Sequence, residues 1–490
     1  MVSVRKRIAV FTEYLSQDQY LPQRKMLGLL LPALLGTRSP VLMEIGTKCM
    51  VPAGGWHGLS KIETKRAKDT HEHYLSRHLA NPRLDMLALL DRHFELIGPP
   101  LLEKQGKGVN FVVDGTDYQK AWARPKRPRG MKGATRVRDG SASTRETATI
   151  GMGYPAITIE ASLPNGVQMP ILHWLYSRED ADPITGERYL GDEQVLHAVL
   201  KRVAPLVGEK SFVCFDEGYA GHGSLLAFDA LKLPWVVRVP STGGSGRRWI
   251  QDDTGMEWHL DEMVCRMDLP FSRRRVVGRG KETLDIRLGV AKVYLKEESS
   301  RPSAPWQTRA RTLVVVEVNG AAKRMALLVH DWLGDTEEVV ELIRSEYRRR
   351  WRVEESHRLN KSDWGFKAEN FRVLTLRAIQ RLVLLCMLIS TFVAHFRDKE
   401  PDRARTLAGR SFAAGDVPRD PRYRLNQVIG DILKRWLRAT IGRRAPGRRR
   451  GPDPPPDPLK IVDRVKNAWR RLKRLQREAL AAGVELPAMR

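Results

Sequence analysis

The sequence predicts an α/β protein, in which helices flank a mixed sheet and a β-rich insertion interrupts it. Three observations support this class. Short apolar runs alternate with helical patterns over residues 106–240, which is typical of a layered sheet. Strand-like alternation without helices fills residues 241–325. Helical periodicity dominates both ends of the chain. We therefore expect a two-part core, residues 106–240 and 326–399, with helical regions at 1–105 and 400–490.

Residues 1–105 are expected to form a helical N-terminal domain. The stretch "DMLALLDRHFELIG" carries apolar residues at helical spacing, and Pro99 and Pro100 are expected to end that helix.

Two buried strands of the core end in acidic residues and glycine. "VNFVVDGTD" carries Asp114 and "SFVCFDEGY" carries Asp216, each directly after an apolar run. Functional groups gather at strand ends in α/β sheets, so both acids are candidates for a site. Between them, "ATIGMGYPAITIEASL" and "VQMPILHWLYS" predict two further strands around a "PNG" turn.

The remaining segments complete the predicted organisation. In the insertion, "LDIRLGVAKVYLKE" and "ARTLVVVEVNG" alternate like antiparallel strands. "MALLVHDWL" returns to a buried strand, and Thr336 opens a long helix with acids in its first turn. A second buried helix follows over residues 375–396. The region 400–490 is basic and helical, with a linker rich in Pro and Arg.

The charge balance indicates a polyanionic partner. The chain has 84 Lys and Arg against 57 Asp and Glu, a net charge of +27, which favours nucleic acid. A membrane is not expected, because the longest apolar run, Leu382–Ala394, is shorter than the roughly 20 residues that span a bilayer. The four cysteines lie far apart, which suits a reducing cytoplasm.

The stretch "EYRRRWRVEESHRLNK" raises the question of whether one face of a helix belongs to a functional site. On a continuous α-helix, Tyr347, Arg350, Glu354 and Lys361 share one stripe. A carboxylate between cations and a phenol could grip a phosphodiester near a metal ion. The alternative is a solvent-facing helix held by salt bridges, since a segment so rich in Arg and Glu produces such stripes often.

The strand-end acids favour the site. Carboxylates brought together repel each other unless a cation neutralises them. Asp114, Asp216 and Glu354 could together hold two Mg²⁺ ions, which prefer oxygen ligands.

Order and spacing also resemble a known family. The chain is similar to bacterial cut-and-paste DDE transposases, specifically the insertion-sequence-four group, whose signature Y-x2-R-x3-E-x6-K is matched by Tyr347, Arg350, Glu354 and Lys361. The contexts "VVDGTD" and "CFDEGY" and the β-rich insertion match as well. The resemblance covers roughly residues 109–395.

The resemblance implies an RNase H-like core and DNA strand cleavage and transfer with two Mg²⁺ ions, for which Mn²⁺ can substitute. It implies double-stranded DNA partners, namely the terminal inverted repeats and the target, bound by a homodimer, and often a hairpin intermediate. Asp114, Asp216 and Glu354 would be the catalytic metal ligands. Tyr347, Arg350 and Lys361 would contact the DNA.

Several nearby residues are expected to have other roles. The acids Asp117, Glu217 and Glu355 should point away from the site. Trp351 should pack in the interior. One tryptophan of the insertion could stack on a flipped base, and the sequence leaves three candidates: Trp249, Trp258 and Trp306. The basic run after the first acid is expected to face DNA: Lys120, Arg124, Lys126, Arg127, Arg129 and Lys132.

Other functions stay open from sequence alone. Another RNase H-like nuclease would need neither the insertion nor the basic tail. A non-enzymatic, transposase-derived DNA-binding protein would have no need of all three acids. A structural nucleoid protein would explain the charge but not the strand-end carboxylates. We expect a bacterial, cytoplasmic, nucleoid-associated protein.

Overall fold

The structure is a computed structural model of the 490-residue chain. It describes residues 4–37, 41–42, 45, 72–106, 108–120, 133–138, 147, 149–189, 191–240, 248–277, 282–297, 303–321, 324–354, 356, 375–402, 404 and 429. The chain divides into two compact units, Met1–Gly442 and Arg443–Arg490. The expected C-terminal region, 400–490, therefore lies almost entirely outside the described residues, as do its linker and last helix.

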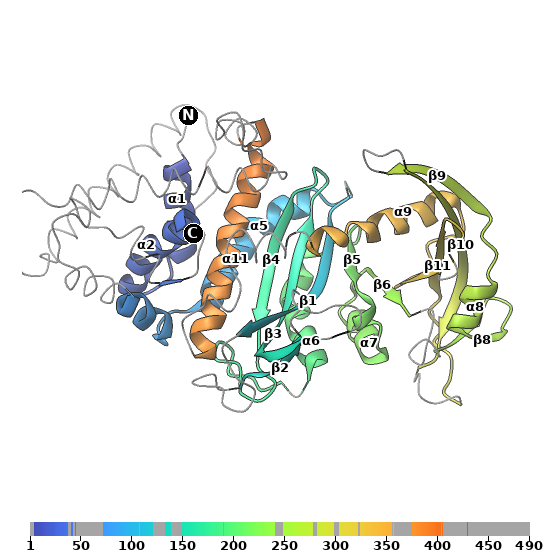
Figure 1. Ribbon diagram of the computed structural model, residues 1–490, viewed down its shortest axis with the longest axis horizontal. Helices are drawn as coiled ribbons and strands as arrows, with labels where there is room; N and C mark the ends of the chain where they lie inside the picture. Colours follow the sequence, from blue (N-terminus) through green and yellow to red (C-terminus); the bar gives the residue numbers. More distant parts are fainter. Residues whose placement is uncertain are drawn as a thin grey trace, which may run out of the picture. The chain divides into compact units, whose positions relative to one another are not determined.

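The described part is a mixed α/β structure with one large, mostly antiparallel sheet (Figure 1). Its labelled α-helices are α1 (Val4–Ser16), α2 (Leu21–Thr37), α5 (Met86–Glu103), α6 (Asp192–Val203), α7 (His222–Ala230), α8 (Leu260–Arg266), α9 (Glu337–Arg348) and α11 (Leu376–Lys399). Its strands are β1 (Asn110–Lys120), β2 (Thr135–Arg138), β3 (Ile150–Ser162), β4 (Gln168–Leu175), β5 (Phe212–Phe215), β6 (Trp235–Val239), β7 (Trp249–Asp252), β8 (Glu257–His259), β9 (Phe271–Val277), β10 (Glu282–Leu295), β11 (Arg311–Val318) and β12 (Met325–Val329).

The described residues among the first hundred are mostly helical, as expected, but α5 does not stop at its proline pair. It continues through Pro99 and Pro100 to Glu103. The prediction of a stop was wrong because the lost backbone hydrogen bonds fall in the last turn, where burial of Ile97 and Leu101 holds the helix against the core.

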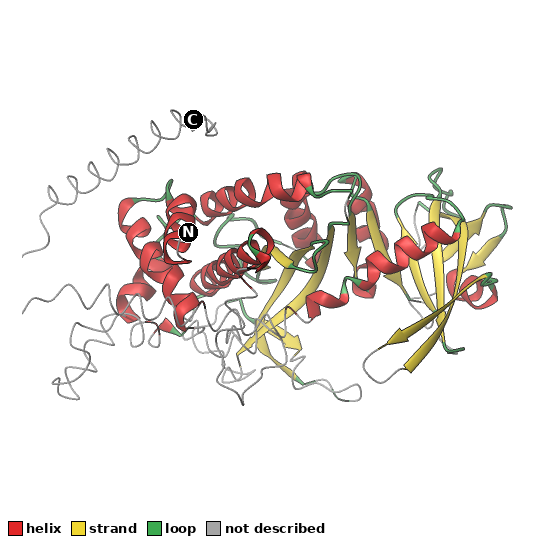
Figure 2. Cartoon of the chain, turned by 90° about the horizontal axis from the view of Figure 1, so that it is seen from above, coloured by secondary structure: helices red, strands yellow, loops and turns green. Residues whose placement is uncertain are grey.

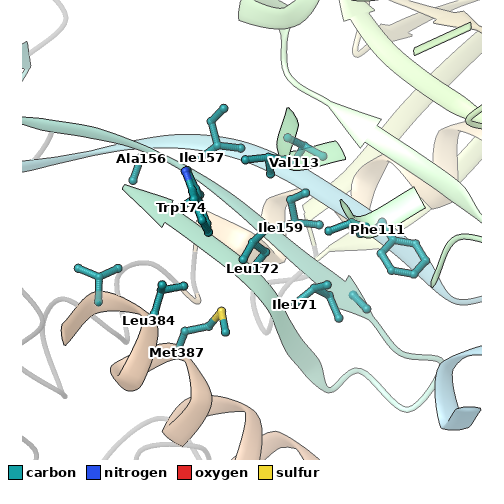
Figure 3. Packing of buried hydrophobic residues seen from close by; sticks show 14 of the residues in the cluster. Phe111, Val113, Ala156, Ile157, Ile159, Ile171, Leu172, Trp174, Leu384 and Met387 are labelled. Carbon is teal, nitrogen blue, oxygen red and sulfur yellow. The ribbon is translucent and has the colours of Figure 1, made fainter. Parts of the chain in front are cut away.

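The helix α11 is buried, as its apolar run predicts. It is long and apolar enough to cross a membrane, but 89% of its most apolar stretch is buried inside the protein. Its Arg381 donates hydrogen bonds to the carbonyl groups of Leu79, Asn81 and Leu84, which ties it to the N-terminal helices. Leu384 and Met387 of α11 face the sheet at β4 (Figure 3).

The half of the sheet that carries Asp114 and Asp216 has the order β4-β3-β1-β5-β6. The strand β1 runs antiparallel to β3 and parallel to β5, and β5 runs parallel to β6. Alternate residues of β1 serve the two faces, as the pleat requires. Phe111 and Val113 join the larger core, whereas Val112 packs in a second core with Ile343 and Tyr347 of α9.

The strands of the insertion continue the same sheet beyond β6. From β6 the order continues β12-β11-β10-β7-β8, and β9 pairs with β10. Within the described residues, the insertion is built of strands and the short helix α8 (Figure 2). The predicted β-rich character is therefore confirmed by the strands β7 to β11, and β12 links them to the core.

Candidate active site

Two of the predicted acids stand side by side on adjacent parallel strands. The last paired residues of β1 and β5 are Val113 and Phe215, and Asp114 and Asp216 are the next residue on each strand. The strand β5 ends there, but β1 continues to Lys120 by pairing with β3. The expectation that Asp114 leaves its strand was wrong. It sits in mid-strand, at the point where the parallel neighbour stops.

The third acid is carried by a helix that changes character. The helix α9 begins at the Thr336 cap, as predicted, and ends at Arg348. The next bonds run between residues three apart: Arg350 N–H donates to Tyr347 O at 2.9 Å and Val353 N–H to Arg350 O at 3.0 Å. This is the tighter 3₁₀ pattern. The expected continuous α-helix is therefore wrong, although helical geometry resumes over residues 351–354.

Arg350 joins the acids to one another. Its Nη2 atom lies 3.0 Å from Glu354 Oε1 and 3.7 Å from Asp216 Oδ1. The arginine is only 7% exposed, whereas the Asp216 and Glu354 side chains are 40% and 38% exposed. A buried guanidinium thus holds two partly exposed carboxylates together from beneath.

The pKa of Asp114 shows that all three acids share one electrostatic environment. The pKa of this carboxyl is raised from 3.8 to about 6, and burial is the largest cause. Arg350 and the Gly115 amide act to lower it, and the negative charges of Asp216 and Glu354 raise it further. Repulsion among clustered carboxylates has this signature, and a nearby cation relieves it.

The structure does not place the other two signature residues, Tyr347 and Lys361, at the acids in the way that it places Arg350. Tyr347 is 6% exposed, packs in the second core, and has the Arg350 guanidinium 5.8 Å from its ring centre. Its hydroxyl has no hydrogen-bond partner among the described residues, and burial raises its pKa. Lys361 lies outside the described residues. The structure therefore brings together three of the four signature residues, and DNA contact by any of them stays a prediction.

A buried polar network that the sequence did not reveal fixes the start of this segment. Arg349 pairs with Glu346 at 2.9 Å and donates to the carbonyl group of Gly108. Glu346 also accepts from Asn110, the first residue of β1. Gly108 has a φ of +89°, and a Cβ there would stand 2.9 Å from the Arg349 guanidinium. The contacts to Gly108 and Asn110 span more than two hundred residues, so no local pattern indicates them.

Two of the three neighbouring acids have hydrogen-bond or ion-pair partners of their own, and Asp117 also lines the cleft described below. Asp117 accepts a hydrogen bond of 2.9 Å from the Arg138 amide, and Glu217 pairs with Arg238 at 3.3 Å. Glu355 lies outside the described residues. So does the basic run, apart from the backbone of Lys120 in β1.

A cleft of 530 Å³ opens beside Asp114 and Asp216. Its walls mix charges of both signs, with Arg178 and Asp192 joined by two hydrogen bonds of 2.8 and 2.6 Å. The buried tyrosines Tyr176 and Tyr219 also line it. No local pattern predicts this cleft, because its lining residues come from strands, loops and the helices α6 and α7, which are far apart in the chain.

The tryptophans depart from expectation at one position. Trp351 is 62% exposed, so the prediction that it packs inside was wrong. The 3₁₀ turn that precedes Trp351 changes the direction of its side chain from the one that a continuous α-helix would give. Trp249 stacks on His259, while the ring nitrogens of Trp258 and Trp306 donate to Asp252 and Glu257. All three are partly exposed, and the structure does not single one out for a flipped base.

The donor set suits a divalent cation. It consists of carboxylate oxygens, the ligands that Mg²⁺ prefers, and their mutual repulsion would be relieved by a cation. Among the described residues, however, no group of three or more metal-ligand side chains stands at binding distances. The acids are gathered around Arg350 instead, and closing on an ion requires side-chain movement.

The chain was compared with known families. Residues 184–392 match the family model described as the transposase DDE domain. This segment of the chain is similar to transposase DDE domains. The matched segment begins after β4 and ends within α11, so it includes Asp216 and Glu354 but not Asp114. The strand β1, which carries Asp114, is joined to the matched segment by its pairing with β5.

Other comparisons add little to this. No curated protein matches the sequence. One solved structure that aligns with the chain is the cryo-EM structure of the piggyBac transposase synaptic complex with hairpin DNA. The alignment covers 93% of this chain and 86% of the chain in that structure, with 10% identity and a TM-score of 0.36. At that TM-score the likeness is too distant to define the fold.

Proposed function

We propose that this protein is a DDE transposase of the insertion-sequence-four group that cuts DNA at transposon ends and joins those ends to target DNA. The observation that carries the proposal is the convergence of Asp114, Asp216 and Glu354 on Arg350 beside the matched transposase domain. The spacing of Tyr347, Arg350, Glu354 and Lys361 supports the group assignment.

The strand order supports an RNase H-like core. Three strands form an antiparallel meander, β4-β3-β1, and two more, β5 and β6, follow in parallel beside β1. Parallel neighbours place their carboxyl ends at one edge, where sites form in such sheets. The domain division that we propose follows it: an N-terminal DNA-binding domain (1–105), a core (106–240 and 326–399), the insertion (241–325) and a basic tail (400–490).

Asp114, Asp216 and Glu354 would hold Mg²⁺, or Mn²⁺ in its place. Two such ions lower the pKa of an attacking water or 3′-hydroxyl and stabilise the leaving oxygen. Asp114 must lose its proton to serve as a ligand, and its raised pKa makes that loss depend on pH near 6. Arg350 keeps the carboxylates gathered in the free protein, and its guanidinium is suited to bind a phosphate oxygen of the DNA.

The partners would be double-stranded DNA, both terminal inverted repeats and target, bound by a homodimer. The net charge of +27 supports a polyanionic partner. A hairpin at the cut ends and a bacterial, nucleoid-associated location complete the proposal.

An excision assay tests the function. A plasmid carries a marker gene that is interrupted by a DNA segment ending in the sequences that flank this protein's gene. The protein is expressed in the same cells. We expect the marker to be restored by the active protein and not by Asp216→Asn. Restoration at equal frequency with both proteins, or with neither, would reject the proposal.

Salt dependence tests the role of the basic tail. Binding to the flanking DNA should weaken steeply with ionic strength, because each phosphate contact releases counterions. Removing the residues after Pro446, which lie in the separate compact unit, should flatten the plot of log affinity against log salt. The measurement is fluorescence anisotropy with labelled DNA from about 50 to 200 mM salt. An unchanged slope would mean that the tail does not touch DNA.

A further inference from the structure

A fully buried carboxylate, Glu160, lies on the same face of the sheet as the acids. It belongs to β3, where Thr158 pairs with Asp114 and Glu160 pairs with Val112. Paired residues share a face, and so do residues two apart on one strand. Glu160 therefore stands one step along the sheet from Asp114, and its exposure is 0%.

Glu160 contacts the segment that carries the third acid. The hydroxyl group of Ser356 donates to Glu160 Oε1 at 2.9 Å, and His173 Nε2 lies 3.6 Å from the same oxygen. The other oxygen, Oε2, has no hydrogen-bond partner among the described residues. A buried carboxylate is costly to keep, so a sheet that needed only packing here would be better served by an apolar residue.

The backbone is shaped to place this carboxylate. The β3–β4 pairing shifts between Ile159 and Glu160, which leaves Ile171 of β4 as the extra residue of a β-bulge. His93 of α5 fixes that bulge, because its Nε2 lies 3.1 Å from the Ile171 carbonyl oxygen. Burial lowers the pKa of His93 to about 4, so the ring is neutral and this nitrogen donates. Bulges commonly re-aim a side chain beside an active site.

Ser356 follows Glu354 by two residues. The opposite end of the same segment is held by Arg349, through Glu346 and the Gly108 carbonyl. The short helical stretch with Arg350 and Glu354 is thus tied at one end beside β1 and at the other to β3. The strands β1 and β3 are paired neighbours, and β1 also bears Asp114.

We propose that Glu160 is a positioning residue: by holding Ser356, it sets the place of Glu354 relative to Asp114 and Asp216. The role rests on the proposed function, since it matters only if Glu354 acts on DNA. Displacing a reacting group by about 1 Å can cost about 10²-fold in rate, so loss of this tie should slow cleavage without weakening DNA binding.

Hydrogen exchange and cleavage rate together test the proposal. In full-length Ser356→Ala, amides of residues 347–356 should exchange at least about tenfold faster, while those of β3 keep their protection. Cleavage at saturating DNA should fall about 10–100-fold, with an unchanged Kd for DNA. Ser356→Thr, which keeps the hydroxyl group, should restore both values.

A matched control is Ser345→Ala, because within the described part of the chain the hydroxyl group of Ser345 bonds only the Leu342 carbonyl of its own helix, at 2.9 Å. It should leave exchange and rate at their original values. Glu160→Gln keeps an acceptor for Ser356 and should retain most of the rate, whereas Glu160→Leu should match Ser356→Ala.

The outcomes separate the two claims. If the unaltered protein cleaves DNA and Ser356→Ala changes neither exchange nor rate, the positioning role is overturned. It is also overturned if β3 loses protection together with residues 347–356, because the contact then only stabilises the fold. If exchange responds as expected but the unaltered protein cleaves no DNA, the proposed function fails and the structural tie stands.

Discussion

Asp114→Asn should abolish DNA cleavage and at the same time raise the melting temperature of the metal-free protein at pH 7. The amide has nearly the same shape but cannot supply an anionic oxygen to a metal ion. Partners that only orient metal ligands account for about 10–100-fold in activity, so loss of a ligand itself should cost more than about 100-fold. Cleavage is measured on a gel with Mg²⁺ and with Mn²⁺, beside a thermal melt in the presence of a chelator.

The gain in stability should depend on pH in a defined direction. The folded-state pKa of Asp114, about 6, lies above its ordinary value of 3.8. Between these values the folded protein binds more protons than the unfolded chain, so Asp114 lowers stability as pH rises through this window. Asp114→Asn removes that penalty. Its advantage should be full above about pH 6 and should vanish below about pH 4.

A melting temperature of Asp114→Asn that is lower than that of the original protein at pH 7 would contradict the crowded-carboxylate account. Asp117→Asn is the control on the same strand, because Asp117 accepts a hydrogen bond from the Arg138 amide. It should leave cleavage within about twofold of the original rate.

Arg350→Ala should lower both cleavage and stability, and Mg²⁺ should restore part of the stability. Removing the guanidinium leaves Asp216 and Glu354 without the cation that lies 3.7 and 3.0 Å away. A solvent-exposed salt bridge would cost less than about 1 kcal/mol. Because Arg350 is buried, its loss should lower the free energy of unfolding by more than that value and should therefore lower the melting temperature. A bound divalent cation should offset the repulsion between the two carboxylates.

Arg352→Ala is the matched control for Arg350→Ala. Arg352 is two residues away, and its guanidinium lies toward Gly166, 3.8 Å from where a Cβ on that glycine would stand. Its charge acts on the Glu346 carboxyl group. Cleavage by Arg352→Ala should therefore stay within about twofold. Equal damage from both substitutions would show that the segment has no catalytic side.

The strand-end logic found the pair Asp114 and Asp216, because apolar runs ending in acids are a local pattern. What it missed is that β1 continues, since the polar residues after Asp114 are held by pairing with β3, a partner far along the chain. The same limit applies to the contact between Glu346 and Asn110, which meet only when α9 packs beside β1.

The helix carrying Glu354 illustrates a different limit. A 100° wheel placed Arg350 and Glu354 on one side correctly, because helical geometry resumes over residues 351–354 and residues four apart share a face of an α-helix. It misplaced Trp351, since the change to 3₁₀ bonds after Arg348 involves neither proline nor glycine and leaves no mark in the sequence. Contacts of Arg349 and Glu346 with distant residues, rather than local helix propensity, determine the conformation of this turn.

Iron-mediated self-cleavage tests most directly whether Asp114, Asp216 and Glu354 form one metal site. Fe²⁺ bound in place of Mg²⁺, with ascorbate and peroxide, produces radicals that cut the backbone close to the ion, and the fragments are mapped by mass spectrometry. We expect cuts clustered near residues 114, 216 and 354, suppressed by excess Mg²⁺ and all lost together in Asp216→Asn. Cuts near only one of these positions, or a pattern unchanged in Asp216→Asn, would contradict the shared site.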